Sequence, residues 1–239
     1  MAYYLGIDSS TQSLKGLVID PAAGAVVAGA SVNFTADLPQ YGCPDGVLAN
    51  PDPLVKHADP LMWLAALDLM LERLKAAGVD MGKVAAIGGD GQQHGSVYLN
   101  ALFFPTLASL SSCAGPSLAE RFSTTLSRRT SPIWMDSSTS AECRELDARF
   151  GARLQADTGS PAIERFTGPQ IRKFAKTEPE RYAQTARVHL VSSFLCSVLT
   201  GSDARIDTGD GAGMNLLNLR AQAWDAEIAE FTAPGLAAR

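Results

Sequence analysis

Apolar and polar residues alternate in short blocks over the first part of the chain. Three apolar runs, at residues 3–9, 14–20 and 25–35, are separated by short polar breaks. Runs of this length, rich in Val, Ile and Leu and divided by turn residues, are typical of consecutive β-strands. The pattern therefore predicts a β-meander at the start of the chain.

After these runs, the spacing of apolar residues changes. Residues 36–60 are rich in Pro, Gly and Asp, which predicts a long loop, and residues 61–77 predict an amphipathic helix that ends at Gly78. Residues 83–89 then predict a short buried strand. The order β-β-β-α-β indicates a mixed α/β lobe. The apolar face of the helix is made by Leu61, Leu64, Leu67, Leu71 and Leu74.

The second half of the chain predicts mostly helices. A strand is expected at 131–136, a helix at 138–150, a largely helical segment at 169–200 that breaks near Pro179, and a strand at 213–219. The helix at 138–150 is expected to turn its charged residues to solvent. These are Glu142, Arg144, Glu145 and Asp147.

Composition and charge limit the kinds of function that this protein can have. The 239 residues are 46% hydrophobic and carry a formal net charge of −5, as in an ordinary globular protein without a basic surface for nucleic acid. The N-terminus MAYYLGID lacks the features of a signal peptide, and no apolar run approaches the roughly 20 residues of a membrane span. We therefore expect a cytoplasmic protein that binds neither nucleic acid nor membrane.

The cysteines are irregularly spaced and form no C-x-x-C pair, so a zinc site or disulfide framework is not expected. We expect reduced thiols that are mostly buried. They are Cys43, Cys113, Cys143 and Cys196.

The first segment with chemical potential is LGIDSSTQSLKG, residues 5–16. An apolar strand delivers Asp8 to its end, where a carboxylate can hold Mg²⁺ directly or through water. The following turn can direct backbone N–H groups and the hydroxyls of Ser10 and Thr11 at phosphate oxygens, with Lys15 opening the next strand. It is not a Walker A loop, and a plain hairpin with a polar turn is the alternative.

The second segment is GGDGQQHGS, residues 88–96, directly after the predicted strand. Its glycines allow sharp turns and close approach to a ligand. Gln93 and His94 offer the amide and imidazole groups that sugar hydroxyls need. The alternative is that His94 only satisfies buried carbonyls.

Two later segments are weaker. In ERFTG, residues 164–168, Arg165 could fork two hydrogen bonds onto a ligand, or simply pair with a surface carboxylate. In IDTGDGAGMNLL, residues 206–217, Asp207 and Asp210 lack the spacing of a calcium loop and predict a turn with capping aspartates. The remaining histidines have no partner pattern and are expected to be structural or exposed; they are His57 and His189.

Together, these segments resemble the FGGY carbohydrate kinases, and within them the eukaryotic-type xylulose kinases. The resemblance covers nearly the whole chain. GID-x-x-[ST] is shared across the actin-like ATPase superfamily, whereas the second, third and last segments are more specific to xylulose kinases. The matching segments are GIDSSTQSLK (6–15), GQQHGS (91–96), SPIWMDSSTSAECR (131–144), ERFTG (164–168), LVSSF (190–194) and DGAGMNLL (210–217).

The resemblance implies an α/β, ribonuclease H-like lobe with a mixed sheet and flanking helices, and residues 1–239 as one substrate-binding domain. It implies that Asp8 lies near Mg-ATP and that Gln93, His94 and Arg165 contact the sugar. Trp134 would form part of the pocket wall. Ser10 stands where the family's phosphate loop usually has Gly, which leaves the phosphate contacts of this turn open.

The resemblance also implies an ATP- and Mg²⁺-dependent enzyme that converts D-xylulose to D-xylulose 5-phosphate. The general base in such kinases is an Asp in a G-D-N segment that begins a second, nucleotide-binding lobe. No G-D-N occurs in residues 1–239. We therefore expect that lobe to be absent from this chain and the chain alone to be inactive.

Several alternatives stay open at this point. The partners expected are a small sugar and the second lobe, and a homodimer is compatible with the sequence. One alternative function is a non-catalytic sugar-binding or regulatory module, and another is a kinase for a different ketose or polyol. A third is another ATPase of the actin-like superfamily, which GQQHGS and ERFTG disfavour because such proteins have no small-sugar pocket.

Overall fold

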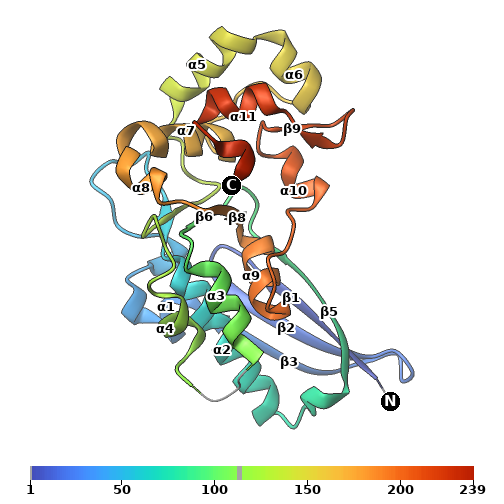
Figure 1. Ribbon diagram of the computed structural model, residues 1–239. Helices are drawn as coiled ribbons and strands as arrows, with labels where there is room; N and C mark the ends of the chain where they lie inside the picture. Colours follow the sequence, from blue (N-terminus) through green and yellow to red (C-terminus); the bar gives the residue numbers. More distant parts are fainter. Residues whose placement is uncertain (1, 112–114) are drawn as a thin grey trace.

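The protein is built on a four-stranded sheet, with helices packed beside it and gathered at one end (Figure 1). The computed structural model describes residues 2–111 and 115–239. The strands are β1 (Tyr3–Ser9), β2 (Ser13–Asp20), β3 (Ala25–Asn33) and β5 (Val84–Gly91). Their order is β3-β2-β1-β5, with β1 antiparallel to β2 and parallel to β5. The predicted meander and mixed sheet are confirmed.

One face of the sheet is covered by the long helix α2 (Pro60–Ala76), close to the predicted 61–77. Asp59 caps its N-terminus by accepting a hydrogen bond from the backbone N–H of Leu61 at 2.9 Å. Trp63 and Met70 of this helix are fully buried. Gly16 of β2 is needed at this contact, because an added Cβ would lie 2.4 Å from the Sδ of Met70.

The opposite face of the sheet is open in the described part of the chain. Along β1 and β2, buried and exposed residues alternate, and Tyr4, Leu17 and Ile19 are 47%, 50% and 40% exposed. The prediction of a buried strand at 83–89 was wrong on burial, since nearly all of β5 is exposed. The reason is that α2 packs on β2 and β3, whereas β5 forms an edge of the described sheet.

The predicted loop at 36–60 is partly ordered into short elements. They are α1 (Phe34–Asp37), two 3-10 turns (Pro39–Tyr41 and Pro44–Gly46) and β4 (His57–Ala58). β4 pairs with β7 (Ser131–Pro132), the only part of the predicted strand 131–136 that forms a strand. This pairing brings the loop beside the segment that contains WMDSST.

The helices gathered at one end of the molecule in Figure 1 share an apolar core of their own, separate from the core under the sheet. These helices include α5 (Ser140–Phe150), α6 (Ala152–Thr158), α7 (Thr167–Thr177), α8 (Pro179–Ala183) and α11 (Ala226–Thr232). The predicted helix at 138–150 is confirmed, but Glu142 is buried rather than solvated. The Nζ of Lys176 lies 3.0 Å from its carboxylate, which compensates the buried charge.

The predicted helical segment 169–200 contains a strand that the sequence did not indicate. β8 (Arg187–Leu190) pairs antiparallel with β6 (Ser96–Leu99) and leads into α9 (Val191–Thr200). The predicted strand 213–219 shrinks to β9 (Leu217–Asn218), which pairs with β10 (Ala223–Trp224). The other helices are α3 (Phe103–Ala108), α4 (Leu118–Phe122) and α10 (Thr208–Ala212).

Of the cysteines in the described residues, Cys43 and Cys143 are buried, Cys196 is exposed, and all three are free thiols. Cys113 lies outside the described residues. In residues 2–111 and 115–239, no helix has the length and apolar character that a membrane crossing requires.

Candidate functional site

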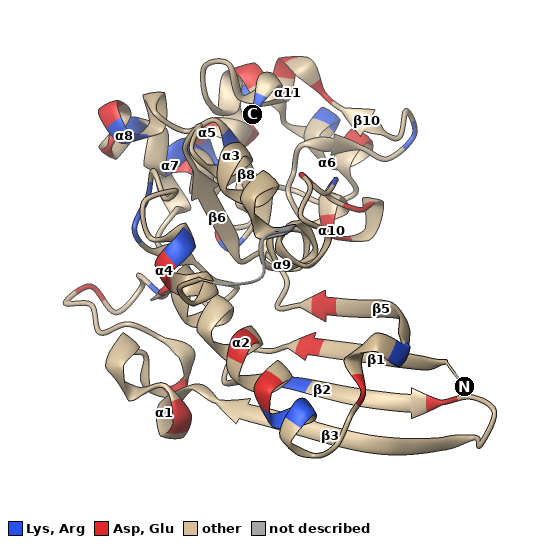
Figure 2. Cartoon of the chain, turned by 60° about the horizontal axis from the view of Figure 1, so that its bottom comes forward, with Lys and Arg blue, Asp and Glu red and all other residues tan. Residues whose placement is uncertain are grey.

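Two carboxylates meet where β1 and β5 end. The parallel register places Asp8 directly opposite Asp90, and Figure 2 shows acidic positions near the arrowheads of both strands. Partial desolvation, the charges of Asp8 and Asp210, and a hydrogen bond with Asp8 together raise the pKa of Asp90. We call Asp8 and Asp90 the acidic strand ends. Sequence reasoning missed Asp90, although it lies within the motif GGDGQQHGS.

The turn after Asp8 is closed by its own hydrogen bonds. The hydroxyl of Ser10 donates to the carbonyl of Ser13 at 3.0 Å, so this group is already engaged. The Oγ1 of Thr11 accepts from the indole Nε1 of Trp134 at 2.9 Å. Lys15 is exposed and pairs in register with Asp8 across β1 and β2. The predicted phosphate turn therefore has its lysine beside the acidic strand ends.

His94 lies in the loop between β5 and β6 with a left-handed backbone, at a φ of 63°. This conformation is uncommon for a residue other than Gly and often occurs at functional sites. Its Nδ1 lies 3.0 Å from the carbonyl of Gly213, which makes Nδ1 the protonated nitrogen and leaves Nε2 as an acceptor. Burial, reinforced by the charge of Arg165, lowers the pKa of His94 despite that hydrogen bond. A neutral imidazole suits recognition of a hydroxyl group.

Phe166 completes the surroundings of His94. The two rings stack with centroids 4.7 Å apart and an interplanar angle of 24°. Arg165 precedes Phe166, is exposed, and makes no hydrogen bond or ion pair with the residues that the structure describes. Its guanidinium is therefore available to a ligand beside His94. We call His94, Arg165, Phe166 and Gly213 the histidine cluster.

Close backbone approach holds the histidine cluster together. A Cβ on Gly213 would lie 2.7 Å from the Cε1 of His94, and a Cβ on Gly168 would lie 2.7 Å from the carbonyl of Met214. The N–H of Gly168 donates to that same carbonyl at 2.8 Å. The segments ERFTG and DGAGMNLL, far apart in the sequence, are thus joined by contacts that only glycine allows.

The segment before Gly213 links the histidine cluster to the acidic strand ends. Asp207 caps α10 and accepts from the N–H groups of Gly209 and Asp210, as the predicted capping turn requires. The carboxylate of Asp210 accepts a hydrogen bond from the hydroxyl of Ser192. Burial is the main cause that raises the pKa of Asp210, whose charge also acts on Asp90.

The predicted site residues therefore fall into two groups. Asp8, Thr11 and Lys15 lie at the sheet end, and His94 and Arg165 lie together in the histidine cluster. Gln93 is exposed next to His94, and its side chain makes no polar contact with other described residues. Trp134 is 45% exposed and contacts the turn after Asp8. Phe166 and Gly213 were missed, because their roles depend on contacts between distant segments.

The two histidines expected to be structural or exposed each have a carboxylate partner. His57 lies 3.4 Å from the carboxylate of Asp136, and His189 lies 3.0 Å from that of Asp203. Burial lowers the pKa of His189 to about 4, against the opposing effect of Asp203. Both rings are therefore structural, and neither belongs to the histidine cluster.

The acidic strand ends fit a magnesium ion that arrives with a phosphate. Within the described ranges, no group of three or more His, Cys, Asp or Glu side chains could hold a metal by itself. Magnesium in phosphoryl-transfer sites typically takes one or two carboxylates, with water and phosphate oxygens completing the shell. Desolvation is the main cause that raises the pKa of Asp90, and the repulsion from Asp8 that adds to it is the kind that such a cation relieves.

Comparison with known proteins assigns the family. Residues 129–237 match the FGGY family of carbohydrate kinases, N-terminal domain. The chain is 45% identical over 236 residues to xylulose kinase 2 of Arabidopsis thaliana, covering 98% of this chain and 42% of the relative. It is 43% identical over 234 residues to xylulose kinase of Rattus norvegicus, covering 97% and 43%.

A solved structure described as a xyloylose kinase from Brucella ovis superposes with a TM-score of 0.73 at 26% identity, covering 99% of this chain and 42% of that one. The predicted ribonuclease H-like lobe of the actin-like ATPase fold is confirmed by such neighbours. The chain spans about two fifths of the length of the curated relatives it matches. It belongs to the FGGY family of carbohydrate kinases.

Proposed function

We propose that this chain forms the sugar-binding lobe of an ATP-dependent kinase that converts D-xylulose to D-xylulose 5-phosphate. The observation that carries the proposal is the proximity of His94 and Arg165. Asp210, on the segment that leads to Gly213, acts electrostatically on Asp90 of the acidic strand ends. A neutral acceptor and an available guanidinium can bind sugar hydroxyls, while the carboxylates face the phosphate side. Relatives named xylulose kinase support D-xylulose as the substrate.

In this proposal each group has a distinct role. The Nε2 of His94 accepts from a sugar hydroxyl, Gln93 adds an amide contact, and Arg165 donates to the hydroxyls on the opposite side of the sugar. The hydroxyl on C5 loses its proton to a base, and its oxygen forms a bond to the γ-phosphorus as the bond to ADP breaks. We expect the base outside residues 1–239.

Asp8, with Asp90 beside it, would hold Mg²⁺ accompanying ATP, and the metal would supply neutralisation of phosphate charge. Lys15 adds a positive charge at the same strand ends. Thr11 fixes the turn through its bond to Trp134. Closure of a second, nucleotide-binding lobe over the sugar would exclude water and limit wasteful ATP hydrolysis. A cytoplasmic location, that second lobe and a homodimer are parts of this proposal.

The test uses the protein extended to the length of its relatives, assayed with ATP and Mg²⁺ against D-xylulose, D-ribulose, glycerol and gluconate. We expect the highest kcat/KM with D-xylulose. His94→Ala should lower that kcat/KM by a factor that corresponds to about 1–3 kcal/mol, the free energy of one or two buried hydrogen bonds. A suitable control is Gln155→Ala, an exposed position on α6, which should leave kcat/KM unchanged.

Three results would count against the proposal. If the extended protein phosphorylated no sugar, the proposed kinase activity would be wrong. A clear preference for another substrate would overturn the assignment of D-xylulose. Wild-type kinetics in His94→Ala would remove His94 from the pocket. Turnover by residues 1–239 alone would contradict the expected position of the base.

A further inference from the structure

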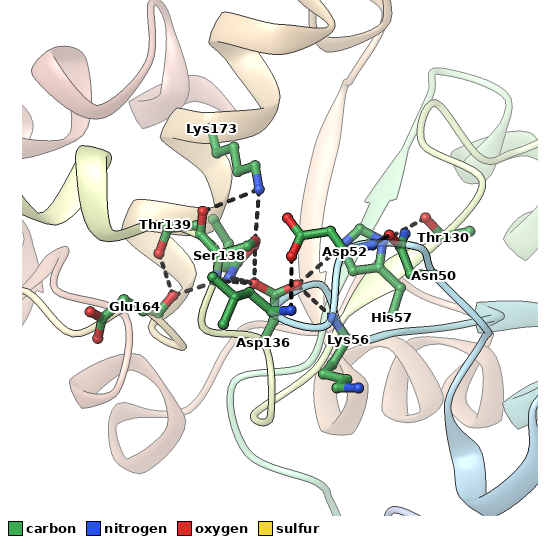
Figure 3. Close-up of polar contacts among 12 residues, drawn as sticks. Asn50, Asp52, Lys56, His57, Thr130, Asp136, Ser138, Thr139, Glu164 and Lys173 are labelled. Atoms are coloured by element: carbon green, nitrogen blue, oxygen red, sulfur yellow. Dashed lines mark hydrogen bonds and ion pairs between the residues drawn. The ribbon is translucent and has the colours of Figure 1, made fainter.

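The buried carboxylate of Asp136, to which the proposed function assigns no role, joins three segments of the chain (Figure 3). The side chain of Asp136 is 0% exposed. Its Oδ1 accepts from the N–H and Oγ of Ser138, at 3.0 and 2.6 Å, and from the Nε2 of Gln170 at 2.7 Å. Its Oδ2 accepts from the N–H of Lys56 at 2.9 Å and faces the Nε2 of His57 at 3.4 Å. We call these five residues the Asp136 cluster.

The Asp136 cluster contains a charge that its hydrogen bonds stabilise. Burial by itself would raise the pKa of Asp136, but hydrogen bonds from His57, Ser138 and Gln170 outweigh it and hold that pKa well below its usual range. Burial lowers the pKa of His57, whose Nδ1 lies 2.8 Å from the hydroxyl of Thr130. An ionised buried carboxylate with this many donors fixes the directions of the groups around it.

One branch of the Asp136 cluster reaches the peptide that precedes Arg165. The Nε2 of Gln170 also donates to the carbonyl of Glu164 at 3.1 Å, and the Oγ1 of Thr139 donates to the same carbonyl at 2.6 Å. The carboxylate of Glu164 accepts from the Oγ of Ser140 at 3.1 Å. Figure 3 shows Ser138, Thr139 and Glu164 side by side next to Asp136. The carbonyl of Glu164 is therefore held from two directions.

The peptide between Glu164 and Arg165 lies in the turn 163–166, which ends at Phe166 beside His94. The N–H of Phe166 donates to the carbonyl of Ile163 at 2.9 Å, which closes the turn immediately before α7. Phe166 then stacks on His94, and Arg165 lies between the fixed carbonyl of Glu164 and the stacked ring. Any shift of Glu164 would therefore move both members of the histidine cluster that this turn supplies.

We propose that Asp136 is a positioning residue for the histidine cluster, acting through Gln170 and the carbonyl of Glu164. Its polar contacts within the described residues include neither His94 nor Arg165, so it acts on the sugar only through the turn 163–166. The kinetic part of this inference rests on the proposed sugar kinase activity. The structural part, the placement of Phe166 against His94, does not.

Gln170→Met gives the most specific test, because it removes both hydrogen bonds of the bridging amide while keeping a side chain of similar length. The stacked ring of Phe166 shifts the His94 imidazole protons in NMR spectra, and the variant should move them toward their values in an unstacked histidine. In the extended enzyme, the KM for D-xylulose should rise about tenfold, while the KM for ATP stays unchanged. Asp136→Asn should show the same pattern.

Thr130→Val serves as the matched control. It removes the hydroxyl that contacts His57 on the side away from Glu164, so it should lower the melting temperature without moving the His94 protons or the KM for D-xylulose. If Asp136→Asn fails to fold, Thr139→Val removes the second donor to the Glu164 carbonyl and takes its place.

The outcomes separate this inference from the proposed function. Unchanged His94 protons in folded Gln170→Met and Thr139→Val variants would overturn the positioning role, whatever the activity. Equal changes in Thr130→Val would also overturn it, since they would reflect general loosening. If the wild-type enzyme uses no sugar while the His94 protons move as expected, the kinase proposal fails and the positioning role is supported.

Discussion

The acidic strand ends and the histidine cluster are built in different ways. Asp8 and Lys15 stand exposed on the open side of the sheet, where backbone pairing alone sets their spacing. His94 and Phe166 are instead stacked, and Gly213 leaves no room for any larger residue beside the imidazole. The histidine cluster is tightly packed, whereas the acidic strand ends lie on an open surface.

Under the proposed function, this difference would divide ligand binding between the two groups. A sugar is uncharged and needs donors and acceptors fixed in advance, because each misplaced hydroxyl loses a hydrogen bond. A phosphate with its metal provides strong charge of its own, so exposed carboxylates at fixed spacing are sufficient for it. Substitutions in the two groups should therefore produce different kinetic effects.

Asp8→Asn should have the largest effect and should separate the two groups. Removing the carboxylate should lower kcat of the extended enzyme by about 10²-fold or more, since electrostatic stabilisation dominates such transfers. Calorimetric affinity of the chain for D-xylulose should stay the same, because the histidine cluster is untouched. Because Asp8 is exposed, the substitution should not disturb folding, and a thermal melt would verify this. Loss of sugar affinity with normal kcat would reverse the roles assigned to the two groups.

Gly213→Ala should have an intermediate effect confined to the histidine cluster. The backbone at this position, with a φ of −83°, accepts alanine, so the only obstacle is His94. Displacing the imidazole should weaken sugar binding by about 1–2 kcal/mol, the usual range for modest overpacking. Calorimetry would measure it against Gly88→Ala, where an added Cβ meets no heavy atom within 4 Å. Equal affinity in both variants would contradict a role for the tight packing of His94 against Gly213.

Acidification should have the smallest effect on function, because the group that titrates is His189, which belongs neither to the acidic strand ends nor to the histidine cluster. His189 hydrogen-bonds Ser193 of α9, and its pKa of about 4 lies below the ordinary value of 6.5. Between those values the unfolded chain binds a proton that the folded chain does not, so stability falls as pH is lowered from 6.5 toward 4. Each pH unit that separates the folded and unfolded pKa values is worth about 1.4 kcal/mol, which sets an upper bound of roughly 3–4 kcal/mol on the loss.

Urea unfolding between pH 7 and pH 4.5 would measure this loss. His189→Gln removes the titrating group and should flatten the dependence, while sugar affinity of the folded protein at pH 7 stays the same. Identical pH slopes for the wild type and the variant would exclude His189 as the cause.

Local patterns predicted the sheet and its charged end well. Alternation of apolar residues in 3–9 and 14–20 reflects a sheet with one covered face, and it is visible without knowing what covers it. Asp8 and His94 were identified because each directly follows or ends such a strand. Their roles in binding remain predictions, since they concern a ligand rather than the fold.

Contacts between distant segments could not be predicted in the same way. β8 has only four residues and leads directly into α9, so its apolar pattern is indistinguishable from one turn of helix. Asp136 was part of a recognised motif, yet its partners Lys56 and Gln170 lie 80 and 34 residues away. The exposure of β5 depends on where α2 packs, which no local pattern records.

The parallel pairing of β1 with β5 also restricts how this protein can tolerate insertions and deletions. Asp8 and Asp90 face each other only in the observed register, in which Gly89 and Gly91 flank the second carboxylate. A slip of one residue would turn that carboxylate to the helix-covered face of the sheet. Length changes between α2 and β5 should therefore survive only when the turn around Gly78 absorbs them, which makes that turn the natural place to probe with a deletion library.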